Sequence, residues 1–288
     1  MGIIRCCLFF LVGGSLHAHF ITFIIPCFNC EPWIEQTVAS IYHQNLHFPF
    51  EIVCTDDGSV DHTWKVLLSL AQQHPEMRVY QHEKNRGGAA ARNTCVFNSS
   101  GDLIFCLDSD NVLEPNSVPL LIDSLDATHS DVVAFQTLRY FSGNRKEEGK
   151  CVYQQADFRF TLKDILEHSD SPPCSGNYLY TRASFDAAKG YPEGNVLDTF
   201  SFGFRQLVAG AKMIFVPGTF YWHRVGTESY FIRESRTGRL HHHFFQCVRE
   251  FKELFTDASI ALIEAEYAKG NGAMDYTEVL SKKMLKLK

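Results

Sequence analysis

The sequence lacks three features that would assign it to well-defined classes of protein. It has no excess of basic residues: 27 Lys and Arg stand against 33 Asp and Glu, a net charge of −6 that argues against nucleic acid as the main partner. Its apolar N-terminal run, residues 6–12, is shorter than the roughly 20 residues that a membrane-spanning helix needs. Internal repeats and low-complexity linkers are also absent, so we expect an ordinary globular chain.

Cysteine is not scarce, but its spacing lacks the pattern of a zinc site. Cys27 and Cys30 form one Cys-x-x-Cys pair, and no second pair follows at zinc spacing. Cys54 and Cys106 fall inside predicted buried strands, where a free thiol packs as a small hydrophobic group. We therefore expect reduced cysteines and a reducing compartment, the cytoplasm.

The N-terminal segment, residues 1–19, has two interpretations. It is either an apolar extension that packs on the domain or lies on a membrane surface, or a weak secretory signal cut after Ala18. Leu16 is bulky at a position where a signal normally has a small residue. We expect a cytoplasmic protein with peripheral membrane contact as an option, and the secretory pathway is the alternative.

Short apolar segments alternate with amphipathic helices through the first half of the chain. Strands are predicted at 20–25, 51–55, 78–81, 103–107 and 132–136. Helices are predicted between them, with Asp61 and Asn116 as caps. Strands that alternate with helices form right-handed crossovers, which predicts an α/β fold with a mostly parallel sheet.

The second half is less regular. We expect a surface loop at 142–150, a strand at 178–181, a helix at 199–208, a strand at 213–216 that Pro217 stops, and helix from 239 onward. The chain is thus divided into the N-terminal segment 1–19, a domain at 20–230 with halves 20–136 and 137–230, and a helical C-terminal extension at 231–288. The basic tail, residues 282–288, is expected to be a frayed end, with an anionic membrane as its alternative contact.

Two carboxylates follow the most apolar strand. Five apolar residues, 103–107, precede Asp108 and Asp110, which places both carboxylates at the carboxyl end of a strand. Neighbouring carboxylates in a half-buried cleft repel each other unless a cation lies between them. Oxygen ligands suit Mg²⁺ or Mn²⁺, so this pair is a candidate metal site, although an isolated Asp-x-Asp also occurs as a polar strand end.

Other polar residues are expected at the same edge of the sheet. They are 26–29 after the first strand, Asp56 and Asp57 after the second, and the 85–88 turn before a helix that carries Arg92. An aromatic face, a carboxylate for a base N–H, arginines for a diphosphate and a metal pair would together bind a nucleoside diphosphate. Neither a Gly-x-x-x-x-Gly-Lys-Ser/Thr loop nor a Gly-x-Gly-x-x-Gly after the first strand is present, so two common phosphate-binding motifs are excluded.

The ordered motifs resemble glycosyltransferase family 2. The resemblance covers about residues 20–230 and is carried by Ile24-Ile25-Pro26-Cys27-Phe28-Asn29, Asp56-Asp57-Gly58-Ser59, Asn85-x-Gly87 with Ala91-Arg92-Asn93, and Leu107-Asp108-Ser109-Asp110. It implies an inverting, nucleotide-sugar-dependent enzyme with a GT-A fold, which is a Rossmann-like sheet flanked by helices. Residues 20–136 would then bind the nucleotide sugar and residues 137–230 the acceptor.

The resemblance also implies roles for individual residues. The nucleotide-binding set is Pro26, Phe28, Asn29, Asp57, Arg92 and Asp108, in which Phe28 and Asp57 hold the base and Arg92 lies near the diphosphate. The metal set is Asp108, Asp110 and His223, with Asp110 as the direct ligand and Asp108 nearer the ribose. His223 stands in an aromatic-His-Arg segment and is either a ligand, a diphosphate contact or a structural residue. The divalent metal, Mg²⁺ or Mn²⁺, would neutralise charge on the leaving diphosphate.

Inversion requires a base that takes a proton from the acceptor hydroxyl. The family has a Glu-Asp pair at a helix start after a Gly-Gly or Gly-aromatic turn, and here Gly190-Tyr191 is followed by Leu197-Asp198. Asp198 is therefore expected to be the catalytic base, although Leu197 replaces the usual Glu. A helix cap is the alternative role for Asp198, and Glu193 is the reserve candidate.

The acceptor is expected to be a hydroxyl of a glycan, a lipid-linked molecule or a protein. Acceptor specificity would come from residues 174–177 and the aromatic residues Tyr178, Tyr191 and Trp222. Two rival functions remain. Sugar nucleotidyl transfer would require a basic Gly-rich loop after the first strand, which residues 26–31 lack, and a non-catalytic nucleotide-sugar or glycan-binding module remains open because of Leu197.

Overall fold

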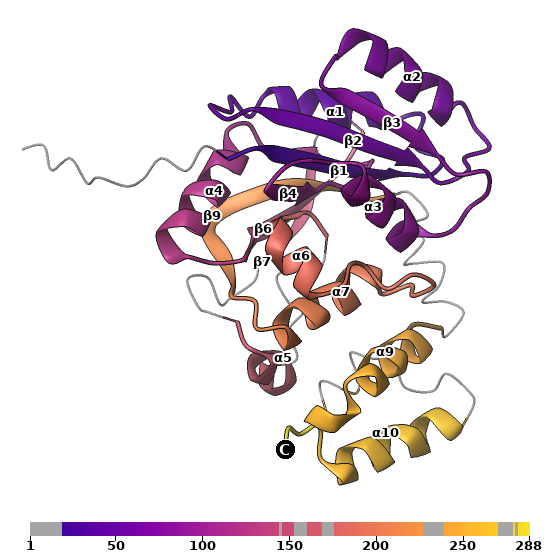
Figure 1. Ribbon diagram of the computed structural model, residues 1–288, viewed down its shortest axis with the longest axis vertical. Helices are drawn as coiled ribbons and strands as arrows, with labels where there is room; N and C mark the ends of the chain where they lie inside the picture. The colour runs from indigo at the N-terminus through magenta and orange to yellow at the C-terminus, as the bar shows by residue number, and fades with distance from the viewer. Residues whose placement is uncertain are drawn as a thin grey trace, which may run out of the picture.

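A mixed β-sheet runs through the described part of the chain, with helices on both faces (Figure 1). The structure is a computed structural model that describes residues 19–143, 146–152, 160–168, 176–226, 239–269, 279 and 282–288. Within these ranges nine strands form the sheet, in the order β3-β2-β1-β4-β8-β6-β9-β5, with β7 paired to β6. The predicted N-terminal segment up to residue 18 and positions 174–175 lie outside the described residues.

The first half of the sheet is parallel, as predicted. Its strands are β1 (Ile21–Cys27), β2 (Phe50–Asp56), β3 (Met77–Gln81) and β4 (Leu103–Cys106). They are joined by α1 (Ile34–Tyr42), α2 (Thr63–Gln73) and α3 (Gly88–Phe97). In the register Cys27 pairs with Asp56 and Ile24 with Cys106, so the carboxyl ends of β1, β2 and β4 meet at one edge.

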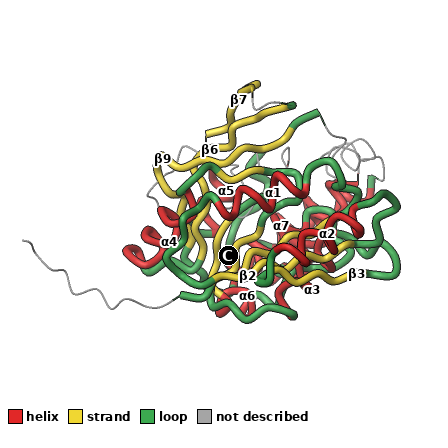
Figure 2. The backbone as a smooth tube through the Cα atoms, turned by 90° about the horizontal axis from the view of Figure 1, so that it is seen from above, coloured by secondary structure: helices red, strands yellow, loops and turns green. Residues whose placement is uncertain are grey.

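The second half adds antiparallel pairings. β8 (Tyr178–Thr181) lies antiparallel to both β4 and β6, whereas β6 (Val132–Ser142) and β9 (Met213–Arg224) run parallel to each other. The remaining elements are β5 (Val112–Leu113), β7 (Lys146–Val152), α4 (Ser117–Thr128), α5 (Leu162–His168), α6 (Arg182–Ala187) and α7 (Asp198–Val208). Figure 2 shows β6, β7 and β9 side by side at one edge of the molecule.

Three predictions in this region are wrong. β6 continues to Ser142 and β7 occupies 146–152, where a loop was expected, because β7 pairs with β6 through its backbone and needs no apolar face. β9 continues past Pro217, because the register of β6 and β9 shifts between Phe135 and Thr137 and leaves the proline outside the ladder. Asn116 is left-handed and makes no cap bond; instead the Gln44 side chain accepts from the Val118 N–H at 2.9 Å.

Two apolar cores lie on opposite faces of the sheet, because successive side chains of a strand point to opposite faces. Phe23, Ile25 and Cys54 face the core that α1, α2 and α4 cover. Ile24 and Val53 face the core that α3, α6 and α7 cover. The described cysteines are all free thiols, as expected.

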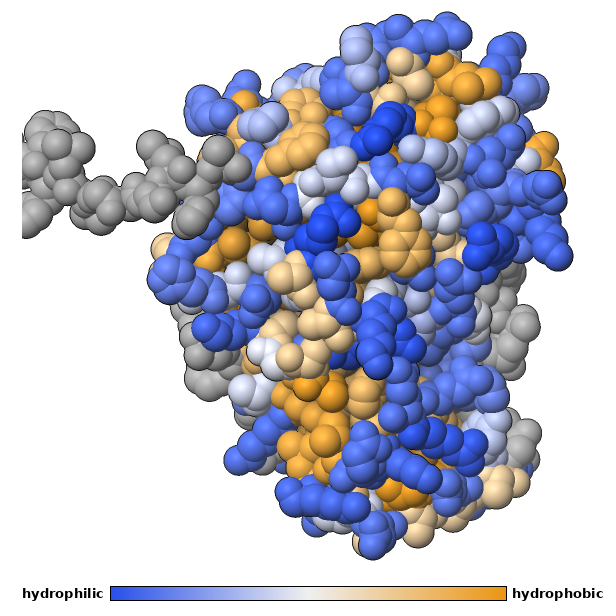
Figure 3. Space-filling model, viewed as in Figure 1, coloured by the Kyte–Doolittle hydropathy of each residue, from blue (hydrophilic) through white to orange (hydrophobic). Residues whose placement is uncertain are grey.

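Between residues 239 and 268 the chain is mostly helical, as predicted, and this part of the C-terminal extension packs on α7. It contains α9 (Arg239–Glu250), a 3₁₀ turn (Lys252–Leu254) and α10 (Asp257–Ala268). The Phe200 and Phe204 rings of α7 lie 5.9 Å from Phe244 and 5.6 Å from Phe251, centroid to centroid. On the face shown in Figure 3, apolar side chains gather in the lower half, where these helices pack.

The basic tail is not a frayed end, so that prediction is wrong. Leu285 is buried, Leu287 forms a β-bridge with Phe255, and the Thr256 N–H donates to the Lys286 carbonyl at 2.9 Å. The tail therefore packs against the start of α10. Among the helices of the described ranges, none has the length and apolarity to cross a membrane.

Candidate active site

Asp57 organises the turn that leads into α3. It is buried just beyond β2, and its Oδ1 accepts from the Nδ1 of His82 at 2.7 Å and from the Arg86 N–H at 2.9 Å. Its Oδ2 accepts from the Gly87 N–H at 2.7 Å. Asp57, which the family resemblance assigns to binding of the nucleotide base, thus also fixes the 85–87 turn to the end of β2.

The loop after β1 presents an exposed aromatic ring. Phe28 is 42% exposed in the loop that follows β1. Asn29 holds the loop in place: its N–H donates to the Ser59 hydroxyl and its Oδ1 accepts from the Val60 N–H, both at 2.9 Å. Pro26 lies within β1, opposite Thr55. The ring of Phe28 is therefore available for stacking on a planar ligand.

Arg92 joins two of the predicted site residues. It lies on α3, is 8% exposed, and its Nη2 donates to Asp108 Oδ1 at 2.7 Å. Its Nη1 donates to Asp198 Oδ2 at 2.6 Å. Asp198 belongs to the first turn of α7, and its Oδ1 accepts from the Thr199 N–H at 2.7 Å. The structure thus brings the predicted base to the Asp-x-Asp segment through one guanidinium.

Charge and burial oppose each other in this group. Burial lowers the pKa of Arg92, but the charges of Asp198 and Asp108 outweigh it and hold that pKa well above its usual value. Burial raises the pKa of Asp198, and the charge of Arg92 acts in the opposite direction. The net effect leaves the pKa of Asp198 above its usual value, and Arg92 is a permanent cation between two carboxyl groups.

Asp110 is a carboxyl group in a crowded, desolvated position. Burial, followed by the charge of Asp108, raises the pKa of Asp110 to about 6. Its backbone carbonyl accepts from the Nε of Arg224 at 2.9 Å, and the Arg224 guanidinium lies between the rings of Trp33 and Phe141 at 4.3 and 4.4 Å. A divalent cation beside Asp108 and Asp110 would relieve their repulsion.

His223 carries a buried ring nitrogen, Nδ1, that has no hydrogen-bond partner among the described residues. Burial lowers the pKa of His223 and outweighs the charge of Asp108, so the neutral imidazole is favoured. A neutral imidazole nitrogen with a free lone pair can bind a metal or accept a hydrogen bond. Tyr140 of β6, which no motif in the sequence marks, packs edge-on against this ring with the centroids 5.7 Å apart.

These residues fit a divalent metal only as a partial ligand set. Within the described ranges, no three His, Cys, Asp or Glu side chains lie close enough together to form a complete metal site. Mg²⁺ and Mn²⁺ sites with few protein ligands are completed by phosphate oxygens and water. The crowded carboxyls of Asp108 and Asp110 and the unpartnered His223 nitrogen fit such a shared site.

Two residues that were expected to contact the acceptor lie in the core instead. Tyr178 and Tyr191 are buried, and their hydroxyls lie 3.1 Å apart.

The other residues considered for the acceptor or for the base make contacts within the protein. Asn177 accepts from the Asp108 N–H at 2.6 Å and so positions the Asp-x-Asp segment. Trp222 donates from Nε1 to Glu114 at 2.7 Å. The reserve base, Glu193, pairs with Arg86 at 3.1 Å on the surface.

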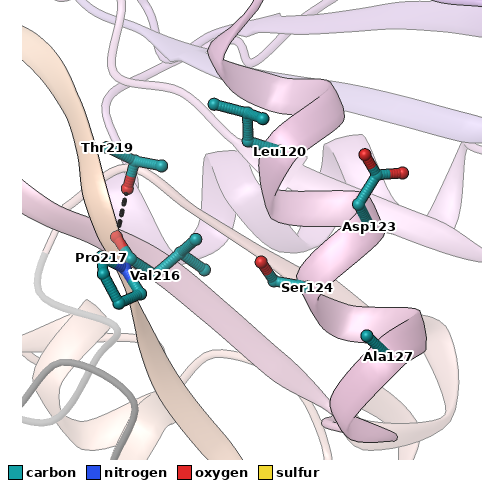
Figure 4. Close-up of a pocket in the computed structure, with 7 residues that line it drawn as sticks. All are labelled: Leu120, Asp123, Ser124, Ala127, Val216, Pro217 and Thr219. Carbon is teal, nitrogen blue, oxygen red and sulfur yellow. Dashed lines mark hydrogen bonds between the residues drawn. The ribbon is translucent and has the colours of Figure 1, made fainter.

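A separate hollow lies between α4 and the bend of β9 (Figure 4). It contains none of the predicted site residues, and Asp123 is its single charged side chain. The Thr219 hydroxyl donates to the Val216 carbonyl at 2.6 Å and closes the bend. The hollow is lined by Leu120, Asp123, Ser124, Ala127, Val216, Pro217 and Thr219.

Comparison with known proteins adds a family and a fold. The profile of glycosyl transferase family 2 matches residues 22–188. Chondroitin synthase of Escherichia coli is 28% identical over 173 residues, which are 60% of this chain and 24% of that protein. The matched part of the chain spans between about a tenth and about a half of the length of its curated relatives.

Two solved structures share the fold. Residues 1–349 of S. aureus TarS, in complex with UDP-GlcNAc, align with a TM-score of 0.66 and 20% identity over 91% of this chain and 75% of that chain. A mannosyltransferase from Pyrobaculum calidifontis, in complex with GDP-Man and Mn²⁺, aligns with a TM-score of 0.61 and 17% identity over 93% of this chain and 74% of that chain. The GT-A-like α/β fold expected from the sequence is confirmed.

Proposed function

Because the chain belongs to glycosyl transferase family 2, we propose that it transfers a sugar from a nucleotide diphosphate sugar to an acceptor hydroxyl with inversion. The observation that carries this proposal is the Asp108–Arg92–Asp198 group at the carboxyl edge of the sheet. In this group one guanidinium joins Asp198, the proposed base, to the segment that would hold the donor. UDP is the expected carrier, and the acceptor is a hydroxyl of a glycan, a lipid-linked molecule or a protein.

Donor binding would use the loops at the ends of β1, β2 and β4. The exposed ring of Phe28 stacks on the nucleotide base, and Asp57, which also organises the 85–87 turn, is the proposed partner of a base N–H. Asp108 and Asp110 face the ribose and the diphosphate, with His223 as a third group near the metal. The nucleotide-sugar complexes of the two similar structures, one with UDP-GlcNAc and one with GDP-Man, support this class of donor.

In the proposed reaction Asp198 is the general base. It takes the proton of the acceptor hydroxyl while that oxygen bonds to the anomeric carbon of the sugar. On the opposite face the bond from this carbon to the diphosphate oxygen breaks, and the electron pair leaves with the nucleoside diphosphate. A divalent metal, when bound, would supply positive charge at that leaving group. The free thiols of the described segments are consistent with a reducing compartment.

Calorimetry with UDP and GDP, each with and without Mn²⁺, tests the donor site. We expect binding that requires Mn²⁺ in the wild type and disappears in Asp110→Ala. Asp123→Ala, an exposed carboxylate outside the site, is the matched control and should bind normally. Nucleotide binding that ignores both Mn²⁺ and Asp110 would refute the metal-assisted site.

The Asp198→Asn variant separates an enzyme from a non-catalytic binding module. An enzyme should lose turnover of UDP-GlcNAc or GDP-mannose and still bind UDP, because the amide cannot take the proton. A binding module would show no turnover in the wild type, and the variant would bind like it. Asp123→Asn controls for the same chemical change at the surface.

A further inference from the structure

We propose that Arg92 is a positioning residue that fixes the Asp198 carboxylate beside Asp108, and that Gly88 is the residue that leaves room for this ion pair. The inference rests on the proposed function, because it assigns how the base is held. It differs from the role near the diphosphate that the family resemblance implies for Arg92.

The contacts of Arg92 are directed into the protein. Each of its three nitrogens already donates to a protein atom: Nη1 to Asp198 at 2.6 Å, Nη2 to Asp108 at 2.7 Å, and Nε to the Cys106 sulfur at 3.4 Å. The guanidinium carbon lies 5.8 Å from the centre of the Tyr191 ring, and the residue is 8% exposed. A planar guanidinium with donors in fixed directions holds two carboxylates in a defined relative geometry.

Gly88 provides an independent observation. A Cβ built on Gly88 would lie 2.7 Å from Arg92 Nη1 and 2.9 Å from Asp198 Oδ2, the two atoms of the ion pair. Its backbone is not left-handed, so any residue could adopt its conformation. Alanine is also the better helix former by up to about 1 kcal/mol. The absence of a side chain at this helix start is therefore explained by the ion pair and not by the backbone.

The neighbouring Gly87 shows the opposite pattern. Its φ of 95° favours glycine, and a Cβ there would meet no atom within 4 Å. The two glycines of the turn therefore have separate roles. Gly87 allows the turn to form, whereas Gly88 allows the side chains of Arg92 and Asp198 to meet.

The ion pair fixes the direction of the base. Asp198 Oδ2 accepts from Arg92 and Oδ1 accepts from the Thr199 N–H at 2.7 Å, so both oxygens are held while each keeps a lone pair for the acceptor proton. Since Asp108 shares the same guanidinium, a shift of Arg92 moves the base relative to the donor segment. Such a shift should reduce the chemical step and leave nucleotide affinity intact.

The test uses Gly88→Ala in the full chain. We expect a normal Kd for UDP with Mn²⁺ by calorimetry, an unchanged KM for UDP-GlcNAc or GDP-mannose, and a kcat that falls roughly 100-fold, as for a misplacement of about 1 Å. Arg92→Lys keeps the charge but not the two-directional fork, and it should show the same split. If Gly88→Ala does not fold, Arg92→Lys carries the test.

A double variant identifies the path of the effect. Because Gly88→Ala acts through Asp198, the combination of Gly88→Ala with Asp198→Asn should lose no more turnover than Asp198→Asn alone. Additive losses would overturn the inference. So would a weakened UDP affinity with normal kcat in Gly88→Ala and Arg92→Lys, since Arg92 would then act on the donor.

Failure of the inference is distinguishable from failure of the proposed function. If Asp198→Asn loses turnover while Gly88→Ala and Arg92→Lys keep it, the inference alone is refuted. If Asp198→Asn keeps full turnover, or the wild type releases no UDP or GDP from either donor, the proposed function is refuted and the inference with it.

Discussion

Replacing Asp57 with Asn should destabilise the protein even when no nucleotide is present. The carboxylate accepts three hydrogen bonds, from His82, the Arg86 N–H and the Gly87 N–H. An Asn side chain has one acceptor oxygen, so its NH₂ group must face at least one of these donors. Because the site is 3% exposed, water cannot take over the lost bond.

The expected cost follows from these contacts. One buried donor left without a partner costs about 1–3 kcal/mol, and the remaining bonds lose the assistance of the negative charge. We expect Asp57→Asn to lower the free energy of unfolding by about 2–4 kcal/mol in urea denaturation. Asp123→Asn, the surface control, should change it by less than about 0.5 kcal/mol.

The nucleotide assay completes the test. If the carboxylate acts mainly through the 85–87 turn, Asp57→Asn should weaken binding of UDP and GDP by similar factors. An unchanged free energy of unfolding, together with a loss of affinity for one nucleotide alone, would refute this reasoning. Asp57 would then contact the nucleotide base and would not stabilise the 85–87 turn.

Two further predictions concern stability away from the site. Burial lowers the pKa of His19, but the hydrogen bonds of this residue to Asp102 and Asp126 outweigh burial, so the pKa is raised. Protonated His19 therefore stabilises the fold fully below the unfolded-state pKa, and this stabilisation is lost as pH rises through the higher folded-state pKa. The difference in Tm between wild type and His19→Gln should therefore be largest near pH 6 and shrink toward pH 9, and a difference that grows with pH would contradict this. Phe244→Ala should lower the free energy of unfolding by about 3–5 kcal/mol, because it removes a 1%-exposed ring that packs on Phe200. Calorimetric melting should then show a Tm lower by roughly 10 °C. A decrease in Tm below about 2 °C would show that α9 adds little to the stability of the fold.

The parallel half of the sheet was predictable from the sequence because its central strands, β1 and β4, are short, mostly apolar runs between turn residues. β1, β2, β3 and β4 begin and end within two residues of the expected positions. Their shared edge followed from the parallel order, which brought Asp57 and Asp108 to the same end of the sheet. Local patterns suffice where burial on both faces imposes a continuous apolar run.

The second half was less predictable because its strands depend on pairing and not on their own pattern. β7 consists largely of Lys, Glu and Gly, and it is a strand because β6 offers it a free edge. β9 contains Pro217, which normally argues against a strand, and only the register shift opposite explains its continuation. The two-residue strand β5 is too short to show any periodicity.

Within the site, residue types were easier to predict than contacts. The sequence indicated Asp108, Asp198 and Arg92 separately, but Arg92 and Asp198 are 106 positions apart and their bond depends on how α7 docks. The burial of individual side chains could not be predicted either. Tyr191 was expected to contact the acceptor, although the centroid of its ring lies 4.1 Å from that of Phe202. The role of Gly88 could not be predicted either, because a side chain there would meet the Arg92–Asp198 pair, which forms only in the folded chain.

The position of Asp198 links the C-terminal extension to the proposed chemistry. Asp198 lies in the first turn of α7, where the helix dipole favours a negative charge. The same helix packs its Phe200 and Phe204 rings on the extension, and Arg205 pairs with Glu250 of α9 at 3.0 Å. One end of α7 thus holds the proposed base, Asp198, while its Phe200 and Phe204 rings contact the extension. Loosening α9 should therefore reduce turnover before it affects binding of UDP, because the loops that we propose for nucleotide binding belong to the other half of the sheet.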